Sequence, residues 1–393
     1  MTSAVDRLQA HSTTTTPARG PIAFFLPTLD GGGAERALVT TAGAIQAAGD
    51  DVVMIVGNAT GALRNDVPSG VTLRDLRRRR VRSALPALVA ELRRTRPQCI
   101  ISTLDHANVL AVIAARIARS GTQPIVRVAN TLSQAALNST RAEAARMRAI
   151  RFVYPYASAV IVPADHVASD LVTFAGLPRE SIRVIPNPVI DAGFMARRST
   201  ALDDPWFASG APPVILGVGR LVQQKRFDLL IDAFRLVRDR CAARLLIMGE
   251  GPERPALEQR VAALGLANEI QLAGFEPNPL RYMSRAEVVA STSSYEGLPA
   301  VLVQALACDA KVVATDCPGG TADLLGNGAF GRLVRPGDPA VFADALVEEL
   351  QSPRRTNDPT SWKPYTVENS VGMYRKLIHT VAVSRAGRHA MNQ

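Results

Sequence analysis

The sequence predicts an α/β fold with two doubly wound parallel-sheet domains that face each other across a cleft. Short apolar runs alternate with segments of helical period, a pattern typical of parallel sheets covered by helices on both faces. The pattern occurs twice, and a stretch rich in Pro, Gly, Asp and Ser separates the two halves. With 393 residues and 47% hydrophobic content, the chain can bury two cores, because domains average roughly 150 residues.

The first half of the chain supplies the expected elements of one domain, residues 21–190. Residues 1–20 form a polar leader with four consecutive threonines, which we expect to be disordered. Strands are expected at 22–26, 51–56, 99–102, 124–129, 159–162 and 182–185, with helices between them such as 34–48 and 108–119. The run Pro186-Asn187-Pro188 stops regular structure, and we assign residues 191–212 to the linker.

The second half repeats the alternation and forms the other domain, residues 213–360. Strands are expected at 214–218, 244–248, 269–272, 287–290, 311–314 and 331–334, with helices at 227–240, 253–264 and 300–308. Residues 361–393 are expected to form a helical tail that crosses back to the first domain. Because open sheets of this type bind ligands beyond the carboxyl ends of their strands, we expect the site in the cleft.

Composition excludes several classes of protein. No run of about 18 apolar residues is present, and the N-terminus lacks the apolar core of a signal peptide. We therefore expect a cytoplasmic protein. The four cysteines show no C-x-x-C pair or zinc-type spacing, and no carboxylate pair is spaced like a metal-binding D-x-D at a strand end.

The net charge of +10 is unevenly distributed along the chain. Nine arginines lie between Arg74 and Arg96, against only Asp75 and Glu91. This window is either solvated surface beside a core helix or a contact for the anionic lipid of a membrane. Nucleic acid is disfavoured, because no aromatic residue interleaves the arginines. Ser83 is expected to cap a helix at the centre of the window.

A glycine loop follows the first strand. Gly31, Gly32 and Gly33 open a helix, where bare backbone and a helix N-terminus can approach an anion. The match to a dinucleotide-binding fingerprint is poor, because Arg36 occupies the third glycine position and no acid ends the next strand. By itself, the loop is a weak indication of a phosphate site.

Two cations flank the loop after the first strand of the second domain. Arg220 and Lys225 are placed to hold two phosphates, one with a planar fork and the other with a point charge. The chain has only four lysines against 41 arginines, so a lysine at this position is unusual. A lysine placed there by chance remains the alternative.

The stretch SSYEGLPAVLVQALACDA puts a carboxylate in a strand-to-helix turn. Glu296 stands beside the backbone N–H groups of that turn, and Gln304 lies just over two helical turns further on. Such a turn can bind a polyol or phosphate while the carboxylate orients hydroxyl groups. Taken alone, the stretch could equally hold a capping glutamate and a surface glutamine.

Taken together, the motifs resemble the retaining nucleotide-sugar glycosyltransferases of family 4, which have the GT-B architecture of two Rossmann-like domains. The motifs are GGGAER, VIPNPV, GRLVQQKRFDLLIDAF, LLIMGEGPERPALE, LAGFEPNP and SSYEGLPAVLVQALACDAKVVATDCPGG.

The resemblance implies a role for each matching residue. Arg220 and Lys225 would hold the donor diphosphate. Glu296 would face the transferred sugar, and Gln304 would stand where the family binds the ribose. The glycine loop would close over donor and acceptor. The remaining donor-binding candidates in these motifs are Gly219, Gly251, Gly297 and Leu298.

Three departures from the family pattern stand out. Gln304 replaces a glutamate, which should cost about 1–2 kcal/mol of donor affinity. Asp309 replaces a common glycine after the helix, and Asp tolerates the left-handed conformation expected there. The family histidine of the first domain falls on Asn130 or Ala129, and His106 is the other candidate at an adjacent strand end.

The expected function is transfer of a sugar from a nucleoside diphosphate sugar, UDP-hexose or UDP-N-acetylhexosamine, to a lipid-linked or polysaccharide acceptor. The resemblance implies no metal and no further cofactor, and the arginine window suggests the inner face of the cell membrane. The first alternative is a catalytically weak nucleotide-sugar-binding partner of another transferase. A dehydrogenase or nucleic-acid binder is the second, and the oligomeric state stays open.

Overall fold

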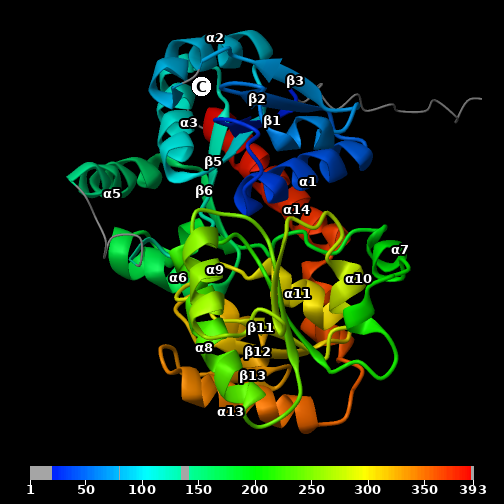
Figure 1. The fold of residues 1–393 in the computed structure, drawn as a ribbon. Helices are drawn as coiled ribbons and strands as arrows, with labels where there is room; N and C mark the ends of the chain where they lie inside the picture. The colour runs from blue at the N-terminus through cyan, green and yellow to red at the C-terminus, as the bar shows by residue number, and fades with distance from the viewer. Residues whose placement is uncertain (1–19, 79, 134–140, 391–393) are drawn as a thin grey trace, which may run out of the picture.

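The computed structural model describes residues 20–78, 80–133 and 141–390, so the leader expected over residues 1–20 lies outside the described residues apart from Gly20. The chain forms two lobes, with the first domain above the second in Figure 1. Each lobe holds one parallel sheet between layers of helices. The predicted fold class, two doubly wound α/β domains, is confirmed.

The first sheet has seven strands in the order β3-β2-β1-β4-β5-β6-β7. Its strands are β1 Ile22–Leu26, β2 Val52–Val56, β3 Thr72–Asp75, β4 Cys99–Thr103, β5 Gln123–Arg127, β6 Ala159–Val162 and β7 Ile182–Val184. The central strands are buried on both faces, which explains why they are continuous apolar runs such as IAFFL and VVMIV.

Helices cover both faces of this sheet. They are α1 Gly33–Ala47, α2 Leu85–Thr95, α3 Asp105–Ala118, α5 Arg141–Val153 and α6 Asp165–Asp170. One face packs against α1 and the C-terminal helix α14 Val367–Ala390, and the other packs against α2 and α3. All strands run parallel, so their carboxyl ends lie at one edge of the sheet. This edge faces the second domain.

The second sheet has six strands in the order β10-β9-β8-β11-β12-β13. Its strands are β8 Val214–Val218, β9 Arg244–Met248, β10 Ile270–Gly274, β11 Val288–Ser291, β12 Lys311–Thr315 and β13 Arg332–Val334. Its helices are α7 Phe194–Arg198, α8 Phe227–Arg238, α9 Arg254–Ala263, α10 Leu280–Met283, α11 Ala300–Ala307, α12 Thr321–Leu324 and α13 Pro339–Gln351. The strand order reverses beside β8, so the loops after β8 and β11 meet at the switch point.

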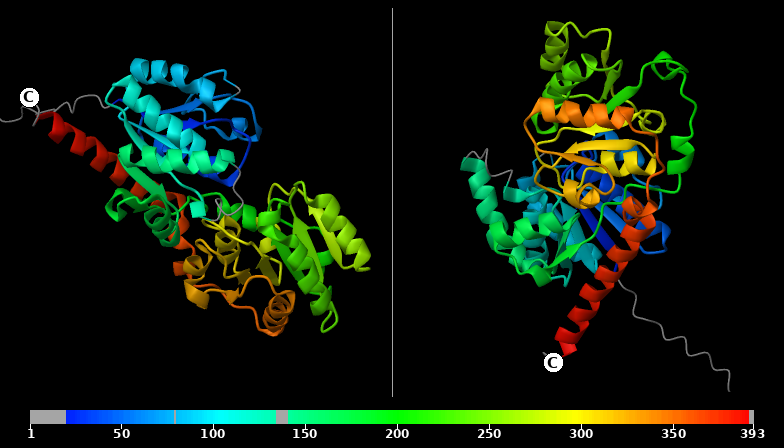
Figure 2. Two further views of the ribbon diagram at one scale, coloured as in Figure 1. Left: turned by 90° about the vertical axis from the view of Figure 1, so that its left-hand side faces the viewer. Right: turned by 90° about the horizontal axis from the view of Figure 1, so that it is seen from below.

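The two chain segments that cross between the domains bind each other. Val189 and Ile190 donate backbone hydrogen bonds to the carbonyl oxygen of Tyr365, and Val367 donates to that of Ile190. Beyond this junction, α14 runs along the first domain (Figure 2), and Tyr374 is buried in that domain's core. Both crossings therefore form a single hydrogen-bonded hinge.

The arginine window differs from its predicted structure in two details. It begins in β3, a short edge strand whose side chains are mostly exposed and whose polar sequence hid it from a search for apolar runs. The prediction that Ser83 caps the helix is wrong: its hydroxyl donates to the carbonyl oxygen of Arg80, and α2 begins at Leu85 after a 3-10 turn.

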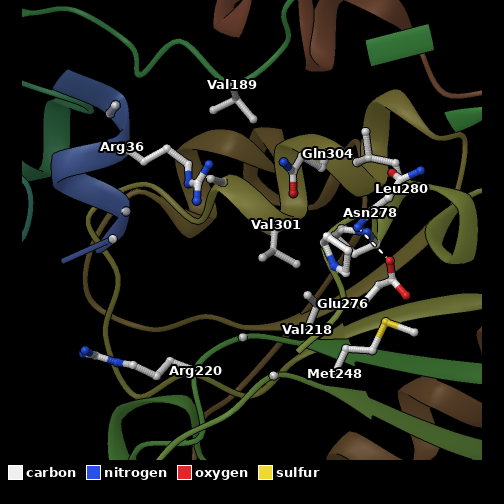
Figure 3. A pocket seen from close by; sticks show the side chains of 18 of the residues that line it. Arg36, Val189, Val218, Arg220, Met248, Glu276, Asn278, Leu280, Val301 and Gln304 are labelled. Carbon is white, nitrogen blue, oxygen red and sulfur yellow. Dashed lines mark hydrogen bonds between the residues drawn. The ribbon is translucent and has the colours of Figure 1, made fainter. Parts of the chain in front are cut away.

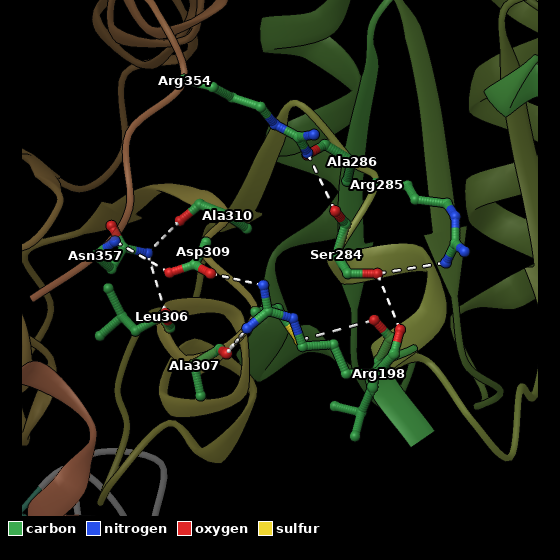
Figure 4. Close-up of polar contacts among 12 residues, drawn as sticks. Arg198, Ser284, Arg285, Ala286, Leu306, Ala307, Asp309, Ala310, Arg354 and Asn357 are labelled. Carbon is green, nitrogen blue, oxygen red and sulfur yellow. Dashed lines mark hydrogen bonds and ion pairs between the residues drawn. The ribbon is translucent and has the colours of Figure 1, made fainter. Parts of the chain in front are cut away.

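Asp309 adopts the left-handed conformation predicted for it, with φ 59°. Its carboxylate also joins three segments of the second domain (Figure 4). Arg198 donates to it at 2.6 Å, and the backbone N–H of Asn357 donates at 3.1 Å. The Asn357 amide in turn donates to the carbonyl oxygens of Leu306 and Ala310. Asp309 therefore fixes the C-terminal end of α11 to the linker helix α7.

Replacing Asp309 with glycine tests this role. Glycine adopts the left-handed conformation without strain, so the loss reports the polar contacts of the carboxylate. We expect the free energy of unfolding to fall by about 2 kcal/mol in chemical denaturation, because the ion pair is only partly exposed. Asp239→Gly, which breaks only half-exposed pairs with Arg235 and Arg238, is the control. Equal losses in both variants would contradict the role.

Candidate active site

A cavity of about 810 Å³ lies between the two domains. The first domain contributes the glycine loop, the start of α1 and the crossing segment around Asn187. The second contributes the loops after β8, β9 and β10 and one side of α11. Figure 3 shows Arg36 reaching from α1 toward α11, which carries Val301 and Gln304. The cavity therefore lies where the carboxyl ends of both sheets meet, as the sequence predicts.

Most charged side chains of the cavity wall have partners. Arg36 pairs with Asp66 at 3.1 Å, and Arg197 pairs with Asp191 at 2.9 Å. The wall carboxylates of Glu250 and Glu276 are likewise held, by Arg254 and Arg281. These groups shape the wall but have little unused charge.

Arg220 is different, because its guanidinium is exposed and has no hydrogen-bond or ion-pair partner within the described part of the chain. It follows β8 directly, at the switch point of the sheet. A free guanidinium carries donors in a fork that matches the oxygens of a phosphate. Of the groups discussed on the cavity wall, Arg220 is therefore best suited to an anionic ligand.

Lys225 and Glu296 form an ion pair directly behind the wall, in which the carboxylate is buried and the Lys225 side chain is 23% exposed. Glu296 is 6% exposed, and it accepts hydrogen bonds from the ammonium of Lys225 and from the hydroxyl of Ser293. A Cβ on Gly219, which lines the cavity, would lie 3.6 Å from the Cε of Lys225. The structure thus brings Arg220, Lys225 and Glu296 into one neighbourhood.

The loops around this pair are held together by hydrogen bonds to backbone carbonyl oxygens. Thr292 donates to the carbonyl oxygen of Lys225 at 2.9 Å, and Gln224 donates to that of Tyr295 at 2.8 Å. Glu296 donates its backbone N–H to Pro318 at 3.0 Å. The loops after β8, β11 and β12 therefore form one unit, and Lys225–Glu296 is an ionic contact within it.

The two domains touch at Gly297. A Cβ there would come within 1.7 Å of the carbonyl oxygen of Ala129 and 2.8 Å of the Oδ1 of Asn130, so only glycine allows this approach. The structure consequently places Asn130, one of the two positions assigned to the family histidine, against the turn that carries Glu296. His106 lies elsewhere, exposed in the first turn of α3 and off the cavity wall.

The other predicted residues divide between the wall and its support. Gly31, Gly33, Gly219 and Gln304 line the cavity, whereas Gly32, Gly251, Gly297 and Leu298 do not. Gly251 packs under the loop after β8, where a Cβ would clash with the carbonyl oxygen of Leu221 at 2.3 Å. Leu298 is buried in the core of the second domain. Their predicted contact with a ligand stays a prediction.

Several wall residues escaped prediction. Arg36, Phe275 and Asn278 line the cavity, and the Oδ1 of Asn278 is buried without a hydrogen-bond partner. Phe275 is 72% exposed, an unusual position for an aromatic residue. The motif LAGFEPNP contains the last two, so an aromatic residue just before a turn-forming Pro-Asn-Pro run was the signal in the sequence that could have identified them.

Two searches of the described residues gave negative results. No group of three or more His, Cys, Asp and Glu side chains in them is arranged to hold a metal ion. None of the helices in residues 20–78, 80–133 and 141–390 combines the length and apolar character needed to cross a bilayer.

Comparison with known families gives matches over both domains. Residues 31–192 match the family described as Glycosyltransferase Family 4, and residues 212–352 match Glycosyl transferases group 1.

Two curated relatives are similar over part of their length. One, from Campylobacter jejuni, is N-acetylgalactosamine-N,N'-diacetylbacillosaminyl-diphospho-undecaprenol 4-alpha-N-acetylgalactosaminyltransferase, 30% identical over 59% of this chain. The other is the alpha-D-kanosaminyltransferase of Streptomyces kanamyceticus, 29% identical over 50% of this chain. The chain spans 61% and 52% of these relatives, respectively.

Solved structures share the fold over nearly the whole chain. Anabaena HepE in complex with UDP and glucose has a TM-score of 0.68 and 21% identity, covering 95% of this chain and 100% of that one. The apo form of the lipopolysaccharide outer core galactosyltransferase WaaB has a TM-score of 0.70 and 18% identity, covering 92% and 99%. These likenesses show the GT-B fold.

The buried carboxylate of Glu296 predicts that Lys225 and Arg220 contribute differently to stability. Replacing Lys225 with methionine leaves the Glu296 carboxylate buried without its counter-ion, so we expect the free energy of unfolding to fall by about 3 kcal/mol. Arg220→Met, which removes an exposed and unpaired group, should change it by no more than about 0.5 kcal/mol. Both are measured by chemical denaturation, and adding Glu296→Gln to Lys225→Met should restore part of the loss. Equal small losses would mean that the pair is not a structural contact.

Proposed function

Because the chain belongs to glycosyltransferase family 4 and has the GT-B fold, we propose that it transfers a hexose or N-acetylhexosamine from a UDP-sugar with retention of configuration. The observation that carries this proposal is the unpaired Arg220 guanidinium on the cavity wall, with Lys225 and Glu296 immediately behind it. A nucleotide sugar carries an anionic diphosphate, which a cation can bind, and a sugar whose hydroxyl groups a carboxylate can accept hydrogen bonds from.

Each residue has a stated part in the proposed reaction. Arg220 and Lys225 neutralise the diphosphate, and Glu296 accepts from hydroxyl groups of the transferred sugar. Lys225 is already paired with Glu296, so the ligand shares the ammonium rather than meeting it free. Gln304, whose side chain makes no hydrogen bond within the described residues, faces the cavity and meets the ribose. An amide offers one acceptor and one donor pair there, where a carboxylate would accept twice.

The proposed chemistry is electrostatic. The bond between the anomeric carbon and the phosphate oxygen breaks, and the acceptor oxygen bonds the same carbon from the same face. The acceptor proton passes to the departing phosphate oxygen, so no protein base is required. The barrier falls because the cations are in place to receive the leaving-group charge. Asn130 lies beside the Glu296 turn, where it orients the acceptor by hydrogen bonding and neither accepts nor releases a proton.

The proposed acceptor is lipid-linked or a polysaccharide at the inner membrane face. The name of the Campylobacter relative includes diphospho-undecaprenol, in which the diphosphate is attached to a lipid alcohol. In this chain the arginine window from Arg74 to Arg96 lies over β3 and α2, and Glu91 neutralises only part of its charge through Arg74 and Arg94. Basic surface of this kind binds anionic lipid with about 1 kcal/mol per residue.

Transfer from a UDP-sugar tests the main proposal. We expect wild-type protein to release UDP from one member of a panel of UDP-hexoses and UDP-N-acetylhexosamines, equally well in the presence of EDTA, since Arg220 and Lys225 take the place of a metal. Arg220→Ala should lower kcat/KM about a hundredfold, for the loss of one charged contact to the transition state. UDP binding without turnover by any donor would instead favour the alternative of a non-catalytic partner. An unchanged kcat/KM in Arg220→Ala would contradict the proposal.

Vesicle sedimentation tests the membrane contact. Neutralising Arg77, Arg78 and Arg80 together should reduce the fraction bound to vesicles containing phosphatidylglycerol at least tenfold at 0.1 M salt. The matched triple replacement of Arg235, Arg238 and Arg240 in the second domain should leave binding unchanged. Equal binding by wild type and the first variant would show that the arginine window is ordinary solvated surface and not a membrane contact.

A further inference from the structure

Arg127 is a buried arginine at the end of a first-domain strand. It is the last residue of β5 and only 2% exposed, which makes it one of the largest fully buried side chains of the protein. It lies on the face of the sheet that packs against α1 and α14. No part of it lines the cavity, so the proposed reaction leaves it without a role.

The guanidinium of Arg127 is bound by neutral groups. Its Nη2 donates to the Oδ1 of Asn187 at 2.6 Å, and its Nη1 donates to the hydroxyl of Thr103 at 3.1 Å. The Nη1 also lies 3.5 Å from the carbonyl oxygen of Ala34. Burial raises the pKa of the Tyr374 hydroxyl, and the adjacent Arg127 opposes part of that rise.

No carboxylate neutralises Arg127 within residues 20–78, 80–133 and 141–390. Burying an arginine without an acid is unfavourable, and its hydrogen bonds offset that cost only in part. An apolar side chain would fill the same space at lower cost. The fork geometry of arginine, which reaches several acceptors at once, is what an apolar residue could not provide.

The acceptors of Arg127 come from segments that are distant in sequence but meet at the cavity. Asn187 lines the cavity, and Ala34 follows directly after Gly33, which also lines it. Asn187 belongs to the first crossing between the domains, and Tyr374 lies in α14 just beyond the second. The two crossings are also joined by the hydroxyl of Ser370, which donates to the carbonyl oxygen of Pro186 at 2.8 Å.

We propose that Arg127 is a positioning residue for the nucleotide-sugar site: its guanidinium fixes the hinge through Asn187 and sets the glycine-loop end of α1 against the second domain. The inference rests on the proposed function. It adds that donor binding depends on a residue that never touches the donor. This role depends on the forked shape of the guanidinium. A lysine keeps the charge but lacks the fork, so it cannot substitute for Arg127.

Calorimetric titration tests the proposal with whichever of UDP and GDP binds the wild type more tightly. We expect Arg127→Lys to weaken that nucleotide about tenfold, the effect of losing one charge-assisted contact. Asn187→Ala should weaken it similarly, and the double variant should lose little more, because Arg127 acts through Asn187. The kinetic counterpart is a raised KM for the donor with a smaller change in kcat.

Arg198→Lys is the matched control. Its guanidinium is also held by several acceptors, the carboxylate of Asp309 and the carbonyl oxygen of Ala307, but it lies off the cavity wall. It should lower stability while leaving nucleotide affinity unchanged. Unchanged affinity in Arg127→Lys, or additive losses with Asn187→Ala, would overturn the proposal.

Hydrogen exchange of the ligand-free protein separates this inference from the proposed function. In Arg127→Lys, the amides of Val189, Ile190 and Val367, which hold the hinge together, should exchange faster than in wild type, while those of β11 and β12 should not change. The same result is expected for the milder Tyr374→Phe. If the wild type binds neither nucleotide, the proposed function fails, and unchanged hinge exchange would then overturn the role of Arg127 independently.

Discussion

The ion pair between Lys225 and Glu296 is the contact on which the geometry of the site depends. A buried carboxylate is tolerated only beside a counter-ion and further donors, which here are the ammonium of Lys225 and the hydroxyl of Ser293. To bring the partners together, the loops after β8 and β11 must meet, and backbone hydrogen bonds join them to the loop after β12. The joined loops also hold Arg220 at the cavity wall, where its guanidinium has no partner among the described residues. The packing that pairs Lys225 with Glu296 therefore leaves one positive charge available for a phosphate.

Close backbone contact between the domains extends this constraint. Gly297 follows Glu296 and lies so close to the carbonyl oxygen of Ala129 that a residue with a Cβ could not take its place. In the first crossing between the domains, Asn187 accepts a hydrogen bond from the buried Arg127. Of the residues in these two contacts only Asn187 lines the cavity, but both contacts join segments next to it: glycine permits the first, and the arginine fork forms the second. Both act on the separation of the two sheets, which decides whether a single ligand can touch both walls.

The sequence was sufficient for the fold, and it also indicated where several candidate residues stand, because both follow local rules. Buried parallel strands must be apolar throughout, so runs such as IAFFL identified them, and the motif GRLVQQK placed Arg220 and Lys225 at a strand end. The edge strand β3 was missed because it is short and polar. The hydrogen bond between Arg127 and Asn187 was missed because it is a tertiary contact, which no local pattern reveals. Ser83 was wrongly assigned as a helix cap because its hydroxyl instead bonds the carbonyl oxygen of Arg80 in the preceding 3-10 turn.

A crystal structure of the protein with a UDP-sugar is the most direct test of the central claim. We predict electron density for the diphosphate within hydrogen-bond distance of both Arg220 and Lys225, the sugar against Glu296 and the ribose against Gln304. A nucleotide bound elsewhere, or one bound in the cavity with the Lys225–Glu296 pair untouched and Arg220 still free, would contradict it.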